Sequence, residues 1–155
     1  MIQKPVNSYS GIYYRKILSY MKKAFKNIDL TFEEGVVLQY AANNPGTSQD
    51  KIARALIFDT AAVARALKEL EAKNMVIREI DQNNQRKKTV NLTEKGREYN
   101  DHINEAMRLW DDKVFGSLSP EETERTIGVM QYLQESAENI DMKELISVFK
   151  NNLQG

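Results

Sequence analysis

The sequence predicts a mainly α-helical fold that contains one small antiparallel β-hairpin. Apolar residues recur with the 3.6-residue period of a helix through most of the 155 residues, and the period changes to two over one short stretch near the middle. Helix-starting signals stand at the head of most of the periodic segments. Hydrophobic residues make up 41% of the chain and charged residues 28%, which is typical of one globular domain of this length.

Five positions carry a capping signal that opens a helix. Four of them place a side-chain oxygen three residues before a carboxylate, which satisfies free backbone amides and opposes the helix dipole. These four signals begin at Thr31, Thr47, Ser119 and Asp141. Asp59 is a simpler cap. Pro120 is favoured at the first helical position because it has no N–H to satisfy, so a helix is expected to begin directly after Ser119.

The caps and the apolar stripes together predict seven helices. They span residues 9–27, 32–43, 48–56 and 60–73, then run from Thr93 to about Gly116, and begin again at Pro120 and Met142. Each carries apolar residues three or four positions apart on one face. We expect the last two helices to bury these stripes, which consist of Ile127, Met130, Leu133 and Ala137 in one helix and Leu145, Phe149 and Leu153 in the other.

The hairpin is predicted where the period changes to two. Residues 75–80 and residues 88–92 alternate apolar and polar side chains, with Val90 and Leu92 on the inward face. The residues between them, 81–87, are all polar and are expected to form a loop. An isolated two-stranded hairpin is marginally stable in water, so this one must pack against the helices that precede it.

The central elements follow the order of a winged helix-turn-helix: two short helices, a turn, a helix, a strand, a polar loop and a second strand. The helix at 60–73 is then the expected recognition helix. Its outward face combines small residues, which permit close approach to a groove wall, with cations that reach phosphates or guanine edges. This face consists of Thr60, Ala61, Ala64, Arg65 and Lys68. The alternative is that Arg65 belongs to an ordinary solvated helix face.

Composition excludes several classes of function. The chain has no cysteine, which removes disulfides, thiolate catalysis, thiol-based redox sensing and thiolate zinc sites. One histidine, His102, is too few for a histidine metal cluster, and beside Asp101 it is expected at the surface. No candidate nucleophile with a base or phosphate-cradling glycine loop is present. We therefore expect no enzymatic activity, no cofactor and no metal site.

The chain also lacks the apolar segments that membranes and secretion require. No apolar run approaches about 18 residues, and residues 1–10 contain no signal-peptide core. We expect a cytoplasmic protein that makes no contact with a membrane.

Charge is balanced overall but unevenly distributed. Residues 1–60 hold eight basic and five acidic residues, residues 61–100 hold nine and six, and residues 101–155 hold five and eleven. A basic centre beside an acidic end suits a core that binds a polyanion, although a polarity gradient without function is the alternative.

Three stretches, at 58–71, 74–78 and 90–96, match one family when taken together. With them, residues 31–96 resemble the winged helix-turn-helix transcription regulators of the MarR family. The resemblance implies a sequence-specific regulator, expected to be a repressor, whose homodimer places two recognition helices in successive major grooves of a near-palindromic operator. In this arrangement residues 31–96 are the DNA-binding lobe, and residues 1–30 and 97–155 are the helical dimerisation region. The apolar stripes of the terminal helices also exceed what one small core can cover.

The resemblance places Arg86 in the minor groove, and the alternative is an ordinary solvated loop charge. Lys87 and Lys88 beside it are better placed for phosphates, which a point charge binds without reading sequence. Two positions depart from the family pattern. The family's wing reads Asp-x-Arg, whereas Asn84 replaces the acid here. Asn74 stands where a glycine commonly ends the recognition helix, and asparagine tolerates the same left-handed backbone. The missing acid keeps open the alternative of a winged helix that binds only protein.

Two further groups of residues are weaker candidates. Thr47, Ser48 and Gln49 are suited to donate to a backbone phosphate, although simple helix capping explains them equally well. Regulators of this family often bind a small aromatic or anionic effector between the dimer helices and the DNA-binding lobe. The side chains suited to line such a crevice are Tyr13, Tyr14, Met21, Tyr40, Met107 and Trp110. Residues of these types at helical spacing are more often plain core.

Overall fold

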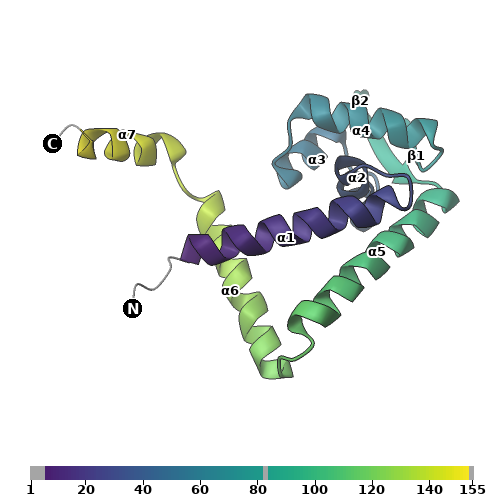
Figure 1. Ribbon diagram of the computed structural model, residues 1–155. Helices are drawn as coiled ribbons and strands as arrows, with labels where there is room; N and C mark the ends of the chain where they lie inside the picture. Colours follow the sequence, from purple (N-terminus) through teal and green to yellow (C-terminus); the bar gives the residue numbers. More distant parts are fainter. Residues whose placement is uncertain (1–5, 82–83, 154–155) are drawn as a thin grey trace. The chain divides into compact units, whose positions relative to one another are not determined.

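The structure is a computed structural model that describes residues 6–81 and 84–153. The described residues form seven α-helices and two β-strands (Figure 1): α1 Val6–Lys26, α2 Phe32–Asn43, α3 Gln49–Leu56, α4 Thr60–Ala72, β1 Val76–Asp81, β2 Asn84–Leu92, α5 Glu94–Phe115, α6 Pro120–Glu138 and α7 Met142–Asn152. They belong to two compact units that meet in the sequence between Trp110 and Asp111. The prediction of a mainly α-helical fold with one antiparallel hairpin is confirmed.

Local capping chemistry sets the predicted helix starts. At the start of α2, Thr31 Oγ1 accepts from the Glu34 N–H at 3.1 Å, and Glu34 Oε2 accepts from the Thr31 N–H at 3.1 Å. Ser119 and Glu122 form the same reciprocal pair at the start of α6. Each pair satisfies amides that the first turn of a helix leaves free. The least accurate start is that of α1, which begins three residues before the predicted position 9.

The hairpin is longer than the sequence predicts. The prediction of a loop at 81–87 is wrong, because β1 extends to Asp81 and β2 begins at Asn84. The strand ladder is held by backbone hydrogen bonds, which polar residues make as well as apolar ones. The pairing passes from Ile80 opposite Lys88 directly to Asp81 opposite Asn84, so the three intervening residues of β2 lie in a register irregularity.

The loop before α3 joins the base of this hairpin. The Val90 N–H donates to the Thr47 carbonyl oxygen at 2.7 Å, and the two residues form an antiparallel bridge. The Gly46 N–H donates to the Val90 carbonyl oxygen at 3.2 Å, and Asn91 Oδ1 lies 2.8 Å from the same nitrogen. Gly46 has a φ of +72°, which glycine adopts without strain. The start of α3 is thereby bonded to β2.

The core of the unit that ends at Trp110 draws on α1 to α5 and on the base of the hairpin. Its fully buried side chains come from each of these elements and include Phe25, Leu38, Ile52, Leu67, Val90 and Ile103. The apolar stripe predicted for α1 is confirmed, since Met21 and Phe25 are buried and Ile17, Ala24 and Ile28 pack against the core. The helices α1 and α5 thus share one core with the helix-turn-helix.

The unit that begins at Asp111 holds the end of α5 together with α6 and α7, and its apolar side chains are exposed. Ile127 and Phe149, for example, are 53% and 57% exposed. The prediction that α6 and α7 bury their stripes is wrong for a single chain, and this holds for all seven residues named for it, Ala137 included. A helix must pack its apolar stripe against another element, and within 111–153 these side chains have no such cover. None of the described helices combines the length and the apolar character that crossing a membrane requires.

Gly96 gives the first prediction, because it allows α5 to approach residue 75 closely. A methyl group at Gly96 would lie 1.9 Å from the Met75 carbonyl oxygen, which is a backbone atom that cannot swing aside. We expect Gly96→Ala to lower the free energy of unfolding by about 2 kcal/mol or more, measured by urea denaturation. Gly128→Ala in α6 is the control: no atom lies within 4 Å of the added methyl, and up to about 1 kcal/mol of stabilisation is expected. Similar effects of the two substitutions would contradict this account.

Candidate nucleic-acid interface

One side of α4 is buried and the opposite side is open to solvent. Val63, Leu67 and Leu70 are fully buried. The residues predicted to face outward are exposed in four cases, Thr60, Ala61, Arg65 and Lys68, and half-buried in the case of Ala64. The division of this helix into a core face and an outward face is therefore confirmed. The outward face carries two cations and small side chains, so little bulk stands between the helix backbone and an approaching ligand.

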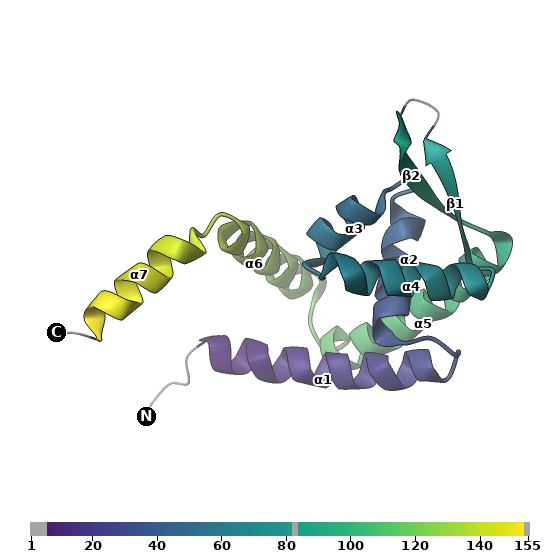
Figure 2. The ribbon, with the colours of Figure 1, turned by 90° about the horizontal axis from the view of Figure 1, so that it is seen from above.

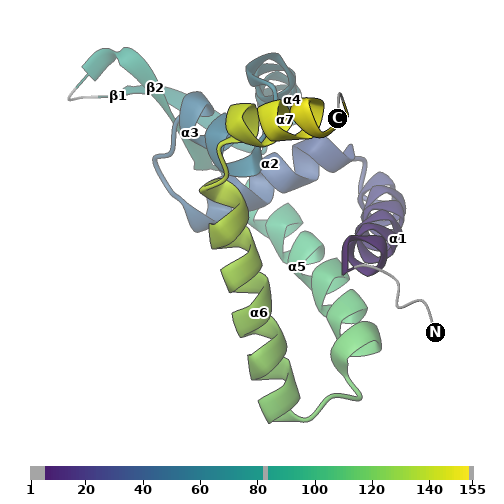
Figure 3. The same cartoon turned by 90° about the vertical axis from the view of Figure 1, so that its left-hand side faces the viewer.

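The β-hairpin lies on the same side of its unit as α4. Figures 1 and 3 both show α4 and the hairpin on the upper side of this unit and α5 on the lower side. In Figure 2, which looks onto the upper side, the hairpin projects past the helices. A ligand that lies along α4 can therefore also meet the hairpin.

The start of α3 offers two of the three residues predicted there. Ser48 caps the helix, with its Oγ accepting from the Lys51 N–H at 3.4 Å, and both Ser48 and Gln49 are half-buried. Thr47, the third residue predicted to meet a phosphate, lies inside the fold, and its role in DNA binding stays a prediction. Thr47 is 4% exposed, and its Oγ1 is buried without a hydrogen-bond partner among the described residues. The backbone bridge to Val90 holds Thr47 in the sheet and its side chain inside the fold.

The predicted cations of the hairpin lie on β2. Lys88 is exposed and stands opposite Ile80. The backbones of Arg86 and Lys87 belong to β2 within its register irregularity, whereas their side chains lie outside the described residues. Irregularities of this kind redirect the side chains of a strand.

An exposed isoleucine at the turn between α3 and α4 was not foreseen. Ile57 ends α3 with a φ of 54° and is 86% exposed. Left-handed backbone is costly for a β-branched residue, so this position is strained. The cap Asp59, which marks this turn in the sequence, carries no information on the φ of Ile57. Asn74 adopts the left-handed backbone that was predicted for it, with a φ of 58°.

An ion pair that was also not foreseen joins the last turn of α4 to β1. The Arg78 guanidinium donates to Glu71 Oε2. This hydrogen bond, more than any other influence, holds the pKa of Glu71 below its usual value, and it raises the pKa of Arg78. The signal in the sequence was the placement of Arg78 on the face that Val76 turns inward, where a charged side chain needs a partner.

The C-terminal end of α4 is tied to the junction of α1 and α2. Lys73 Nζ donates to Glu34 Oε2 at 2.8 Å and to the Asp29 carbonyl oxygen at 2.5 Å. Glu34 is buried, so its carboxylate needs the cation and the capping amide that it binds. Together with Arg78, Lys73 anchors the end of α4 to two neighbouring elements.

The residues predicted to line an effector crevice make structural contacts. Met21 is buried, and Tyr40 and Met107 pack against the core. Trp110 lies 6.2 Å from Tyr13 between ring centroids, and its Nε1 donates to the Tyr13 hydroxyl at 3.4 Å. Tyr14, which was named with them, is exposed. These contacts fit the alternative of plain packing, and effector binding stays a prediction.

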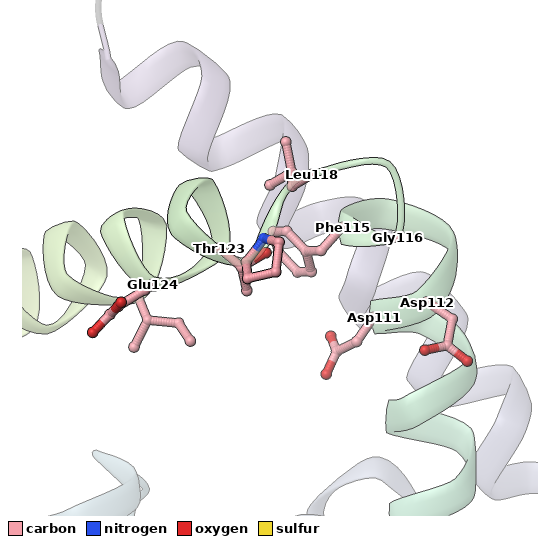
Figure 4. Close-up of a pocket in the computed structure, with 9 residues that line it drawn as sticks. Asp111, Asp112, Phe115, Gly116, Leu118, Thr123 and Glu124 are labelled. Atoms are coloured by element: carbon pink, nitrogen blue, oxygen red, sulfur yellow. The ribbon is translucent and has the colours of Figure 1, made fainter.

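A hollow in the unit at 111–155 was not predicted from the sequence. Its volume is about 570 Å³, and Figure 4 shows it between the end of α5 and the start of α6. Its lining combines the apolar residues Phe115, Leu118, Pro120 and Ile127 with Asp111, Asp112 and Glu124. The three carboxylates give this lining negative charge, which disfavours the binding of phosphate there. Among the described residues no group of three or more acidic or histidine side chains is placed to hold a metal ion, and His102 is exposed.

Comparison with known proteins assigns the winged part of the chain to a family. The family model described as MarR family matches residues 30–88. This chain carries a MarR-family domain. The resemblance seen in residues 31–96 is thereby confirmed.

Relatives of the MarR-family domain bear the names of regulators. A Thauera aromatica protein, whose name assigns it to transcriptional regulation of the hcr operon, is 28% identical over 123 residues, which are 74% of each chain. The uncharacterized HTH-type transcriptional regulator YybA of Bacillus subtilis (strain 168) is 33% identical over 87 residues, which cover 56% of this chain and 58% of YybA.

A solved structure with the same fold is the MepR–DNA complex of Staphylococcus aureus. Its TM-score is 0.74 at 22% identity, with 87% of this chain and 99% of MepR covered. This likeness shows that the MarR-family domain has the winged fold of that protein.

The burial of Thr47 generates the second prediction. An unpaired hydroxyl inside a protein costs about 1–3 kcal/mol, and valine has the same shape without it. We expect Thr47→Val to raise the free energy of unfolding by about 1 kcal/mol and to leave affinity for duplex DNA unchanged. The measurements are urea denaturation and a DNA titration. Ser48→Ala is the control, because it removes an N-cap and should cost about 1 kcal/mol. Weaker DNA binding by correctly folded Thr47→Val would restore the original assignment of this residue.

Proposed function

We propose that this chain is a sequence-specific double-stranded DNA-binding regulator of transcription that acts as a homodimer. The observation that carries the proposal is the exposed face of α4, with Arg65 and Lys68, on the same side of a MarR-family domain as the β-hairpin. The DNA-bound structure of MepR, a protein of the same fold, supports the choice of duplex DNA as the partner.

Each exposed residue then has a chemical role. The N-terminal half of α4 enters the major groove, where Thr60, Ala61 and Ala64 allow close approach and Arg65 donates to the O6 and N7 acceptors of guanine. Lys68 and Lys88 lie near phosphates, which a point charge binds without reading sequence. The first amides of α3, with Ser48 and Gln49, bind a backbone phosphate. By its resemblance to the family's wing arginine, Arg86 enters the minor groove and Lys87 binds a phosphate beside it.

The exposed stripes of α6 and α7 support a homodimer. Large apolar side chains on both helices are about half exposed in one chain, as at Ile127, Met130, Ile146 and Phe149. A second copy has the same stripes and can cover them by two-fold symmetry. We assign residues 31–96 to the DNA-binding lobe, and residues 1–30 and 97–155 to the dimerisation region. Two lobes then meet half-sites about 10 base pairs apart in a near-palindromic operator.

The finer parts of the proposal concern regulation. We infer that the protein is a repressor in the cytoplasm rather than an enzyme, and that a small aromatic or anionic effector releases it from DNA. The names of its relatives support a regulator. The rival function is a winged helix that binds protein and no specific DNA, and the two are separated by the effect of salt.

The third prediction concerns this salt dependence. We expect affinity for a duplex selected from a random DNA pool to fall steeply as salt rises, because phosphate-bound cations release counterions from DNA. Lys68→Ala and Lys88→Ala should each reduce the slope of log affinity against log salt by about one. Lys113→Ala, at the end of α5, is the matched control with an unchanged slope. Affinity that ignores salt would favour the protein-binding rival.

The fourth prediction concerns the homodimer. We expect a dimer in sedimentation equilibrium, and we expect Phe149→Asp to shift it to the monomer because a charge is placed in the apolar stripe of α7. Asn151→Asp adds the same charge on the opposite face of α7 and should leave the dimer intact. A stable wild-type monomer would overturn the assignment of the terminal helices.

A further inference from the structure

One rung of the hairpin is attached to both helices of the helix-turn-helix. Arg78 on β1 stands opposite Val90 on β2. The backbone of Val90 is hydrogen bonded to Thr47 at the start of α3, with the nitrogen 2.7 Å from the oxygen. The side chain of Arg78 is paired with Glu71 in the last turn of α4. The same rung is therefore held from α3 by backbone bonds and from α4 by an ion pair.

Beyond this rung the described side chains of β1 are exposed, whereas Thr89 on β2, opposite Glu79, is half-buried. Among the β1 residues whose side chains are described, Val76 is buried and Arg78 is half-buried, whereas Ile77, Glu79 and Ile80 are exposed. Lys88, which stands opposite Ile80, is exposed as well. Arg78 is thus the outermost described residue of β1 whose side chain is partly enclosed by the fold.

The energetics of the pair favour a geometric role over a stabilising one. The side chains of Arg78 and Glu71 are 24% and 33% exposed, and ion pairs this close to solvent contribute little net stability. The Nε of Arg78 is buried without a hydrogen-bond partner among the described residues, which reduces the net gain further. What the pair does supply is a fixed direction, because a guanidinium donates to a carboxylate in a defined plane.

We propose that Glu71 and Arg78 are positioning residues whose ion pair sets the angle between the hairpin and α4. The proposal rests on the DNA-binding function above, and it names the contact that makes the two DNA-binding elements act as one surface.

The distances involved make this angle important. Each strand residue advances about 3.3 Å, so Asp81, the last residue of β1, lies about 10 Å beyond the rung of Arg78. A rotation of about 20° at the rung moves Asp81 by about 3.5 Å, which is more than the length of a hydrogen bond. A hairpin that turns by this amount loses its contact with the minor groove while α4 remains in the major groove.

The test combines Glu71→Ala with variants of the two DNA contacts. For the selected duplex we expect Glu71→Ala to weaken binding about tenfold, in the range that coupled residues show. In an Arg86→Ala background, where the hairpin contact is already absent, Glu71→Ala should have little further effect. In an Arg65→Ala background its effect should remain about tenfold, because α4 and the hairpin contribute separately. Glu69→Ala, exposed on the same helix, is the matched control and should bind as the wild type does.

Two further measurements separate positioning from loss of structure. Arg78→Gln should weaken binding as much as Glu71→Ala does, and the double variant no more than either one. In hydroxyl-radical footprints of Glu71→Ala, protection of the minor groove should disappear, while protection of guanine N7 from methylation in the major groove remains. Melting curves should be close to those of the wild type.

The outcomes distinguish this inference from the function on which it rests. If the wild type binds no duplex, the proposed function fails. If the wild type binds and Arg65→Ala weakens it, but Glu71→Ala leaves affinity unchanged or acts fully in the Arg86→Ala background, only the positioning role is overturned.

Discussion

The burial of one side of α4 constrains the rest of the DNA-binding lobe. Val63, Leu67 and Leu70 are fully buried against neighbouring helices, so the helix cannot rotate about its axis without exposing them. Removing each such side chain from water contributes about 1.5–3 kcal/mol to the free energy of folding. The orientation of α4 is therefore well determined. Because Arg65 and Lys68 lie on the opposite side of the helix, the burial of Val63, Leu67 and Leu70 also directs these two cations away from the core.

The hairpin depends on that helix as well as on its own strands. Two strands alone are marginally stable, and most described side chains of β1 beyond its base lie in solvent. Its position is set where it touches the helices, through the buried residues Val76 and Val90, the backbone bridge to Thr47 and the ion pair with Glu71. The direction of the hairpin is thus set by the contacts that its base makes with the helices.

In the unit at 111–155, local signals define the helices although their apolar stripes are not buried. Its helices begin where strong local signals place them, at Ser119 and at Asp141, and yet their apolar stripes remain exposed in one chain. In the proposed homodimer a second copy would bury these stripes, so folding would be coupled to association and stability would rise with protein concentration.

The features that depend on near neighbours could be predicted from the sequence alone. Capping residues such as Thr31 and Ser119 act over three positions, and the stripe of α4 acts over one or two turns, so the helices, their starts and the outward face of α4 were predictable. Tertiary structure decided the features whose partners are distant or on another element. Thr47 is held inside the fold by its backbone bridge to Val90, 43 positions away. Glu71 and Arg78 meet across two elements, and Asn84 belongs to a strand because it pairs with Asp81. Burial of an apolar face requires apolar residues at a regular spacing, and this spacing is visible in the sequence. Backbone hydrogen bonds and ion pairs between distant residues require no such spacing.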